Sequence, residues 1–163
     1  MKQLEIHELQ QNIKKSCAFT GHREIKSDFS PQVLKKEVEN LIVQENVKTF
    51  YVGMAMGFDL LAAETVLKVK KKYDVKLVAC IPYYGQEKYF SEKDKKRYLN
   101  VLKKCDESVM VSEKYYKGCL LKRNRYMVDN ADFLIAYLRK DSGGTAYTVN
   151  YYLKKKNNSV IYV

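Results

Sequence analysis

Two spacings of apolar residues alternate along the chain. Short, nearly continuous apolar runs lie at 16–20, 49–52, 75–81, 108–111, 133–138 and 159–163. Their length is typical of strands, and the run at 75–81 is apolar enough to be buried on both faces, as in a parallel sheet. Between the runs, apolar residues recur every three or four positions, as Leu34, Val38 and Leu41 do after Ser30-Pro31. This spacing predicts amphipathic helices, and Ser followed by Pro is a typical helix start.

The order of predicted elements is β-α-β-α-β-α-β-α-β-α-β. Such alternation with short turns predicts an α/β protein with a Rossmann-like, doubly wound, mainly parallel sheet flanked by helices. The chain has 163 residues, which fits one domain, and we expect residues 16–163 to form it. Residues 1–15 form an N-terminal extension, in which a helix is the element to expect.

The sequence predicts a cytoplasmic protein without a membrane partner. No apolar stretch reaches the ~18 residues that a spanning helix needs, and the polar N-terminus lacks the apolar core of a signal peptide. The four Cys residues are widely spaced and form neither a CxxC motif nor a Cys/His cluster. We therefore expect reduced, structural thiols and no metal site. Helices with exposed apolar faces often pack against a second copy, so a homo-oligomer is a further possible partner.

Lysine dominates a formal net charge of +11 and is concentrated in runs at 68–72, 93–97 and 154–156. A basic surface attracts phosphates, which makes nucleic acid one class of partner. The alternative is that these runs are solvated helix surface. We favour the second interpretation, because we expect each run to lie at a helix C-terminus, where cations complement the helix dipole.

The first turn with candidate chemistry follows the first predicted strand. It contains Thr20, Gly21, His22 and Arg23. Gly21 would allow a ligand to approach the backbone, Arg23 could bind a phosphate through two hydrogen bonds, and His22 could also donate a proton. In parallel sheets of this kind, ligands bind beyond the carboxyl ends of the strands, where this turn would lie.

A second glycine-containing turn, 53–59, follows the second predicted strand. Gly53 and Gly57 could direct backbone amides at an anion near a helix N-terminus, and Asp59 could cap that helix or accept hydrogen bonds from ribose hydroxyls. The turn matches neither the dinucleotide fingerprint nor the P-loop pattern. Further into the same helix, Glu64 is either a surface carboxylate or a catalytic one.

The third turn, 141–145, is the strongest candidate for a phosphate site. Gly143, Gly144 and Thr145 stand between a buried strand and an amphipathic helix, which places bare amides, a hydroxyl and the positive end of a helix dipole at one point. The helix before that strand carries Lys122, Arg123 and Arg125, of which we expect at least one to face the cleft.

Taken in order, these motifs resemble those of the YpsA-like proteins of the SLOG superfamily. The resemblance extends over about residues 16–163 and rests on 20–23, on Gly53, Gly57 and Asp59 with 62–64, on Arg123-Asn124 through 130–132, and on 143–145. The superfamily also includes the DNA-processing protein DprA and the LOG-type phosphoribohydrolases. The resemblance implies a Rossmann-like fold and a bound nucleotide or nucleotide derivative such as ADP-ribose or an NAD-like molecule. No other cofactor is implied.

The resemblance leaves catalysis open. The LOG-type motif Pro-Gly-Gly-x-Gly-Thr-x-x-Glu ends in a catalytic glutamate, and Thr148 occupies that place here. A hydroxyl cannot replace a carboxylate in activating water or stabilising an oxocarbenium-like centre. Glu64 and Arg123 are the remaining candidates for catalytic residues.

Three functions follow from these patterns. The first is binding or sensing of a nucleotide-derived small molecule, because three anion-binding turns occur without a complete catalytic set. The second is a nucleotide N-glycosidase or phosphoribohydrolase that uses Arg123, the 143–145 turn and Glu64. The third is binding of single-stranded nucleic acid, for which the positive charge and fourteen tyrosines are the evidence.

Overall fold

A computed structural model describes residues 6, 8–9 and 12–163. The helix expected within residues 1–15 falls largely outside the described residues. The chain runs through β1 (Lys15–Gly21), α2 (Pro31–Glu45), β2 (Val47–Val52), α3 (Phe58–Val69), β3 (Lys76–Ile81), the 3₁₀ helix η1 (Gln86–Tyr89), α4 (Glu92–Lys104), β4 (Glu107–Met110), α5 (Cys119–Asp129), β5 (Phe133–Tyr137), α6 (Gly144–Lys155) and β6 (Ile161–Tyr162).

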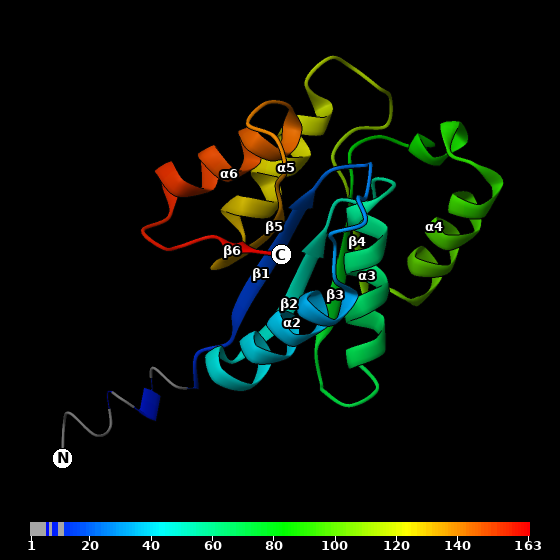
Figure 1. Ribbon diagram of the computed structural model, residues 1–163. Helices are drawn as coiled ribbons and strands as arrows, with labels where there is room; N and C mark the ends of the chain where they lie inside the picture. The colour runs from blue at the N-terminus through cyan, green and yellow to red at the C-terminus, as the bar shows by residue number, and fades with distance from the viewer. Residues whose placement is uncertain (1–5, 7, 10–11) are drawn as a thin grey trace.

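All six strands form one parallel sheet in the order β4-β3-β2-β1-β5-β6 (Figure 1). The chain starts in the middle of the sheet, builds outward to β4, and then returns to the other side of β1. In β1, Cys17 pairs with Phe50 of β2 on one side and with Phe133 of β5 on the other. The order of strands therefore reverses between β1 and β5, and the chain leaves their paired carboxyl ends toward opposite faces of the sheet, into α2 and α6.

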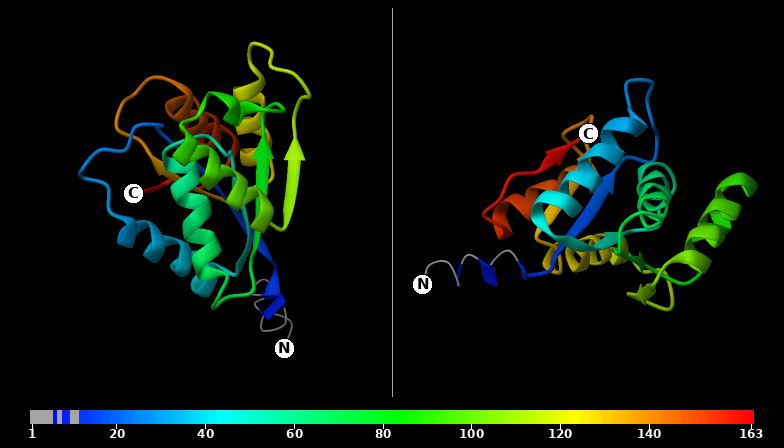
Figure 2. Two further views of the ribbon diagram at one scale, coloured as in Figure 1. Left: turned by 90° about the vertical axis from the view of Figure 1, so that its right-hand side faces the viewer. Right: turned by 90° about the horizontal axis from the view of Figure 1, so that it is seen from below.

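Helices cover both faces of the sheet, as Figure 2 shows from the side and from below. Successive strand residues point to opposite faces, so Cys17 and Phe19 belong to one core and Ala18 to the other. The first core lies under α2, α3 and α4, and the second under α5 and α6. This arrangement confirms the predicted Rossmann-like, doubly wound fold.

The prediction that all three lysine-rich runs lie at helix C-termini is wrong for one of them. The lysine-rich run 93–97 lies at the start of α4, not at its end, because Ser91 caps the helix by accepting a hydrogen bond from the backbone N–H of Asp94 at 3.1 Å. Glu92 and Asp94 supply the acidic groups that suit a first turn. The runs 68–72 and 154–156 do lie at the ends of α3 and α6. No helix among the described residues is long and apolar enough to cross a membrane.

Candidate functional site

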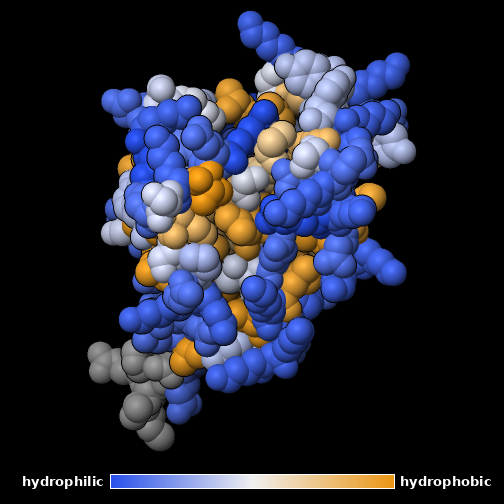
Figure 3. Space-filling model, turned by 45° about the vertical axis from the view of Figure 1, so that its right-hand side comes forward, coloured by the Kyte–Doolittle hydropathy of each residue, from blue (hydrophilic) through white to orange (hydrophobic). Residues whose placement is uncertain are grey.

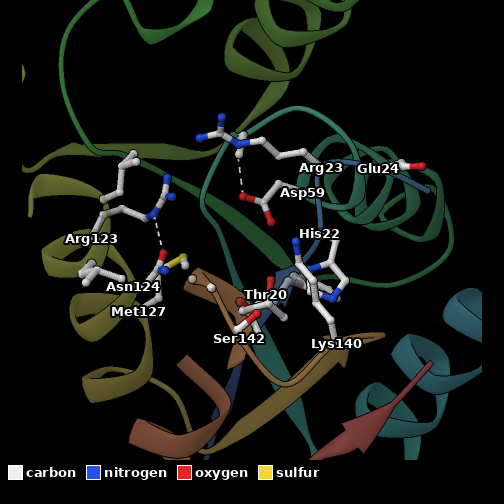
Figure 4. Close-up of a pocket in the computed structure, with 18 of the residues that line it drawn as sticks. Thr20, His22, Arg23, Glu24, Asp59, Arg123, Asn124, Met127, Lys140 and Ser142 are labelled. Carbon is white, nitrogen blue, oxygen red and sulfur yellow. Dashed lines mark hydrogen bonds between the residues drawn. The ribbon is translucent and has the colours of Figure 1, made fainter. Parts of the chain in front are cut away.

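A cavity of about 630 Å³ opens at the carboxyl ends of β1 and β5, where the strand order reverses. Its walls come from the end of β1 and the loop after it, the turn before α3, the start of α5, and the turn before α6. Figure 4 shows side chains from these segments around one hollow. The lining residues are Phe19, Thr20, Gly21, His22, Arg23, Glu24, Ala55, Asp59, Lys117, Gly118, Leu120, Leu121, Arg123, Asn124, Met127, Lys140, Ser142, Gly143, Gly144 and Thr145.

Four polar side chains that line the cavity are at least 94% buried, with exposed fractions of 5% for Thr20 and Arg123 and 6% for Asp59 and Thr145. Buried polar groups in proteins nearly always have hydrogen-bond partners. Within the described part of the chain, the hydroxyls of Thr20 and Thr145 have none. Their bonding capacity is therefore available to a molecule in the cavity.

Asp59 and Arg123 provide opposite charges at this site. Asp59 accepts a hydrogen bond from the backbone N–H of Ala55 at 3.1 Å. Burial raises its pKa, against the opposing effects of the Arg123 charge, of the Ala55 hydrogen bond and of the Arg23 charge. Burial likewise lowers the pKa of Arg123, while Asp59 opposes that shift. A fixed carboxylate beside a fixed guanidinium can recognise both hydroxyl and anionic groups.

Arg123 is held rigidly. One of its terminal nitrogens donates to the carbonyl of Gly53, and its Nε donates to Oδ1 of Asn124 at 2.7 Å. A side chain at Gly53 would collide with this arrangement, since its Cβ would lie 2.8 Å from Oδ2 of Asp59 and 2.9 Å from Cζ of Arg123. Gly53 therefore lies behind the wall of the cavity and allows the two charged groups to approach.

Gly57 and Gly21 also serve packing. Gly57 has a φ of 78°, and a Cβ there would overlap with the backbone carbonyl of Arg23. A Cβ on Gly21 would overlap with the ring of Phe58, whose own backbone N–H donates to the carbonyl of His22 at 3.1 Å. The loop after β1 and the start of α3 are thus fitted together without a gap.

The start of α6 is built differently. Gly143 is the N-cap residue with a φ of 91°, and no side chain caps the helix. A Cβ at Gly143 or Gly144 would meet nothing within 4 Å. Lys140, Ser142 and Thr145 line the cavity beside it. Open space, unpaired amides, the helix dipole and a cation together make a site for an anion.

The start of α5 repeats this design on the same cavity. Gly118 is its N-cap residue with a φ of 100°, again without a side-chain cap, and Lys117 adjoins it. By contrast, Ser30 and Ser91 cap α2 and α4, which do not line the cavity. Helices α5 and α6 thus both begin at this cavity without a side-chain cap, although the first amide of α5, that of Cys119, donates to the carbonyl of Tyr116 at 3.1 Å.

His22 connects the loop after β1 to the turn before α6. Its Nε2 accepts the backbone N–H of Arg139 at 2.9 Å, so that nitrogen carries no proton. Burial lowers the pKa of His22, and the charges of Lys140, Arg139 and Lys26 lower it further. The neutral ring then carries its proton on Nδ1, as a hydrogen-bond donor.

Glu64 and Thr148 lie outside the cavity. Oε1 of Glu64 accepts a hydrogen bond from Nε of Arg97 at 2.6 Å, which joins α3 to α4. The hydroxyl of Thr148 donates to the carbonyl of Gly144 at 2.8 Å along α6. Glu24 and Asp59 are instead the two acidic residues of the lining. In the described part of the chain, no three His, Cys, Asp or Glu side chains gather as a metal ion would require.

The cavity thus brings together ten of the twelve residues predicted to bind a ligand, with Gly53 and Gly57 behind its wall. Sequence reasoning missed Glu24, Lys117, Gly118, Leu120, Leu121 and Lys140. Lys117-Gly118 carried a usable signal, because a glycine directly before a predicted helix marks a start without a side-chain cap. Glu24 and Lys140 carried none beyond their nearness to the predicted turns.

Comparison with known proteins agrees with this fold. The family model YpsA, described as the YspA SLOG family, matches residues 17–162. The chain is 29% identical over 133 residues to UPF0398 protein BH1768 of Halalkalibacterium halodurans, covering 80% of this chain and 66% of that protein. It is 30% identical over 127 residues to the SPbeta prophage-derived protein YoqJ of Bacillus subtilis, covering 70% of this chain and 74% of that one.

Among solved structures, DNA processing protein A of Helicobacter pylori is similar to this chain with a TM-score of 0.64. The similarity covers 90% of this chain and 64% of the other at 19% sequence identity, which shows a shared fold. That structure was described for the way its protein binds single-stranded DNA. The chain thus spans just under two thirds of the length of BH1768 and of this DNA processing protein.

Proposed function

The chain belongs to the YspA SLOG family, and we propose that its cavity binds a nucleotide or a nucleotide-derived phosphate compound of the ADP-ribose or NAD type. One observation carries the proposal: the uncapped N-termini of α5 and α6 reach the same cavity, together with four buried polar side chains. The hydroxyls of Thr20 and Thr145 and the first amides of α6 offer hydrogen bonds that the described part of the protein leaves unused, and Asp59 and Arg123 add charge beside them.

A phosphate fits best at the start of α6. Gly144 and Thr145 begin this helix without a side-chain cap, both line the cavity, and Lys140 adds a positive charge beside them. Anions bind at helix N-termini because the unpaired amides and the dipole act together. Glycine at 143 and 144 keeps the approach clear of side-chain atoms.

The start of α5 offers a second anion position, with Lys117 and Gly118 in the lining. Two such positions in one cavity favour a ligand with two phosphates, such as a diphosphate-linked dinucleotide. The volume of about 630 Å³ lies within the range of about 300–1,000 Å³ that is usual for small-molecule sites.

Asp59 is the residue that we assign to ribose. Its carboxylate is buried in the lining between anion-binding elements and can accept hydrogen bonds from vicinal hydroxyls. The structural relative from Helicobacter pylori binds single-stranded DNA, a polymer of nucleotides, which supports a nucleotide as the class of ligand.

Thermal-shift and calorimetric titrations test the proposal with adenosine, AMP, ADP-ribose and NAD. We expect stabilisation to rise from adenosine to AMP to the diphosphate compounds, since a ligand at 100 times its Kd adds about 2.7 kcal/mol to the free energy of unfolding. If the folded protein binds none of these at millimolar concentration, the proposal fails.

A nucleotide N-glycosidase is the second candidate, and Asp59 is the observation in its favour. Burial raises the pKa of this carboxyl, as is common for a group that exchanges protons in catalysis. Incubation with AMP or NAD followed by chromatography would detect a released base. Asp59→Asn should abolish that release, and Glu64→Gln, away from the cavity, should leave it unchanged.

A further inference from the structure

Exposed tyrosines gather beside the cavity. Among the described residues, six tyrosines belong to the exposed large side chains, and four of these lie in the segments between β3 and α4 and between β4 and α5, with Tyr89 at the end of η1. Their exposed fractions are 70% for Tyr84, 83% for Tyr89, 63% for Tyr115 and 42% for Tyr116. Aromatic rings are normally buried or used at interfaces, so four exposed rings in two adjacent loops indicate a binding surface.

The two loops contact each other and continue into the cavity wall. The rings of Tyr83 and Tyr115 meet edge to face at 5.3 Å between centroids. Tyr116 is followed directly by Lys117 and Gly118, which line the cavity. Both loops leave the carboxyl edge of the sheet, toward which the strand arrows of Figure 1 point. In Figure 3 that upper edge carries mainly hydrophilic side chains with paler ones among them.

The aromatic surface extends onto α6. Arg125 donates a hydrogen bond to the hydroxyl of Tyr147 at 3.0 Å. This bond is the chief reason that the pKa of Arg125 is raised, and Tyr151 and Tyr116 raise it further. Tyr147 stacks on Tyr151 at 6.3 Å with 12° between the ring planes. We call the whole set the tyrosine track, which comprises Tyr83, Tyr84, Tyr89, Tyr115, Tyr116, Tyr147 and Tyr151.

Cations accompany the track along its length. Lys88 lies over the ring of Tyr84 at 5.9 Å, and Lys155 over that of Tyr151 at 5.4 Å. Lys114, Lys117 and Arg125 lie between them in the chain. The acidic neighbours are Glu87, Glu113 and Asp129, of which Asp129 pairs with Lys155 at 2.8 Å and accepts a hydrogen bond from the hydroxyl of Tyr151 at 2.7 Å. The track thus combines stacking surfaces with an excess of positive charge, the two features of surfaces that hold single-stranded nucleic acid.

We propose that the tyrosine track binds single-stranded nucleic acid, with bases stacked on its exposed rings and the phosphate backbone beside its lysines. Unpaired bases are required, because a duplex hides the faces of its bases. One part of this inference rests on the proposed function: the terminal nucleotide of the nucleic acid would enter the cavity past Lys117. Stacking on the track itself does not require that the cavity be filled.

Fluorescence anisotropy with a labelled oligothymidylate of about 20 nucleotides tests the track, since single-strand sites of this kind cover about 4–16 nucleotides. The variants are Tyr84→Leu and Tyr115→Leu, which keep an apolar side chain and remove the ring. We expect each to weaken binding about tenfold. Tyr162→Leu is the matched control, because Tyr162 is 55% exposed on β6 outside the track and should bind as the unmodified protein does.

Calorimetry of AMP with the same variants separates the two proposals. Unchanged AMP binding with weakened oligonucleotide binding supports the track. If AMP fails to bind but oligonucleotide binding depends on the tyrosines, the track holds and the proposed function fails. The track is refuted if the oligonucleotide does not bind at low salt, if it binds equally to the Leu variants, or if a duplex of the same length binds as tightly.

Discussion

The five α-helices of the described chain begin in two ways. Helices α2 and α4 are capped by the side chains of Ser30 and Ser91, which accept hydrogen bonds from Val33 and Asp94. Helices α3, α5 and α6 begin at Gly57, Gly118 and Gly143 without a side-chain cap. The serine hydroxyls accept hydrogen bonds from the first-turn amides of α2 and α4. At α5 and α6 no side chain does so, and both helix starts line the cavity.

The glycine starts differ among themselves, which shows that a glycine N-cap has more than one cause. Gly57 is closed in by the carbonyl of Arg23, whereas Gly118 and Gly143 have open space beside them. Glycine at 57 therefore serves close packing, and glycine at 118 and 143 serves access. Substitutions can separate these roles, because one kind should change stability and the other should change binding.

The largest effect should come from Gly57→Ala. The new methyl group would overlap with the carbonyl of Arg23 at a φ of 78°, and overpacking or a forced left-handed residue costs about 1–3 kcal/mol each. We expect the free energy of unfolding to fall by about 3 kcal/mol in urea titrations. A variant as stable as the unmodified protein would refute the packing role of Gly57.

Gly144→Ala should affect ligand binding without affecting stability. Nothing lies within 4 Å of the new Cβ, and Gly144 does not have a positive φ. Alanine favours a helix by up to about 1 kcal/mol over glycine, so stability should stay level or rise slightly. We expect AMP or ADP-ribose to bind about tenfold more weakly by calorimetry, a loss of about 1.4 kcal/mol. Equal affinity would show that the phosphate does not lie at α6.

Loss of a serine cap should lower stability without changing ligand binding, the opposite of what Gly144→Ala should do. Loss of a serine N-cap typically costs about 1 kcal/mol, so Ser30→Ala and Ser91→Ala should each lower the free energy of unfolding by about that amount. Neither residue lines the cavity, and nucleotide affinity should not change. A loss of affinity in either variant would mean that the division between self-capped helices and ligand-facing helices is wrong.

His22 should produce the smallest effect, one that depends on pH. Burial and neighbouring cations lower its pKa in the folded protein below the ordinary value of 6.5. The unfolded chain therefore takes up a proton first as pH falls below 6.5, and stability is lost until the folded-state pKa is passed. Above pH 6.5 both states are neutral and His22 makes no contribution.

His22→Gln serves as the control, because its amide oxygen can still accept the Arg139 N–H without titrating. We expect urea unfolding of this variant to depend less on pH below pH 6.5 than that of the unmodified protein, because the folded-state pKa of His22 lies below that value. Identical pH profiles would contradict the neutral state assigned to His22.

The sequence predicts the fold and much of the cavity because both depend on local patterns. The spacing of apolar residues identifies the strands and helices, and glycines after buried strands mark turns that a parallel sheet collects at one edge. The three predicted turns do meet there. Local patterns mark Arg123 only as one of several cations on its helix, and the family resemblance was needed to select it, since its contact with Gly53 joins residues 70 positions apart.

Long-range contacts explain what the sequence could not predict. Glu64 has the residue type of a catalytic group, but its partner Arg97 comes from the next helix. The run 93–97 is predicted at a helix C-terminus and lies at the start of α4, although Ser91 three residues before Asp94 is a local capping signal. The packing roles of Gly21, Gly53 and Gly57 depend on atoms from other segments, which no local pattern contains.

The pairing of β1 with β5 has a consequence for how the protein is made. Ala18 lies beside Leu134, and the cavity needs both the loop after β1 and the turn before α6. During synthesis the loop after β1 is made first, but the cavity cannot form until the chain has been extended beyond residue 145, because the turn before α6 is its other side. Such distant pairings slow folding. A small molecule that binds in the cavity would therefore not recognise a growing chain in which the turn before α6 has not yet been made.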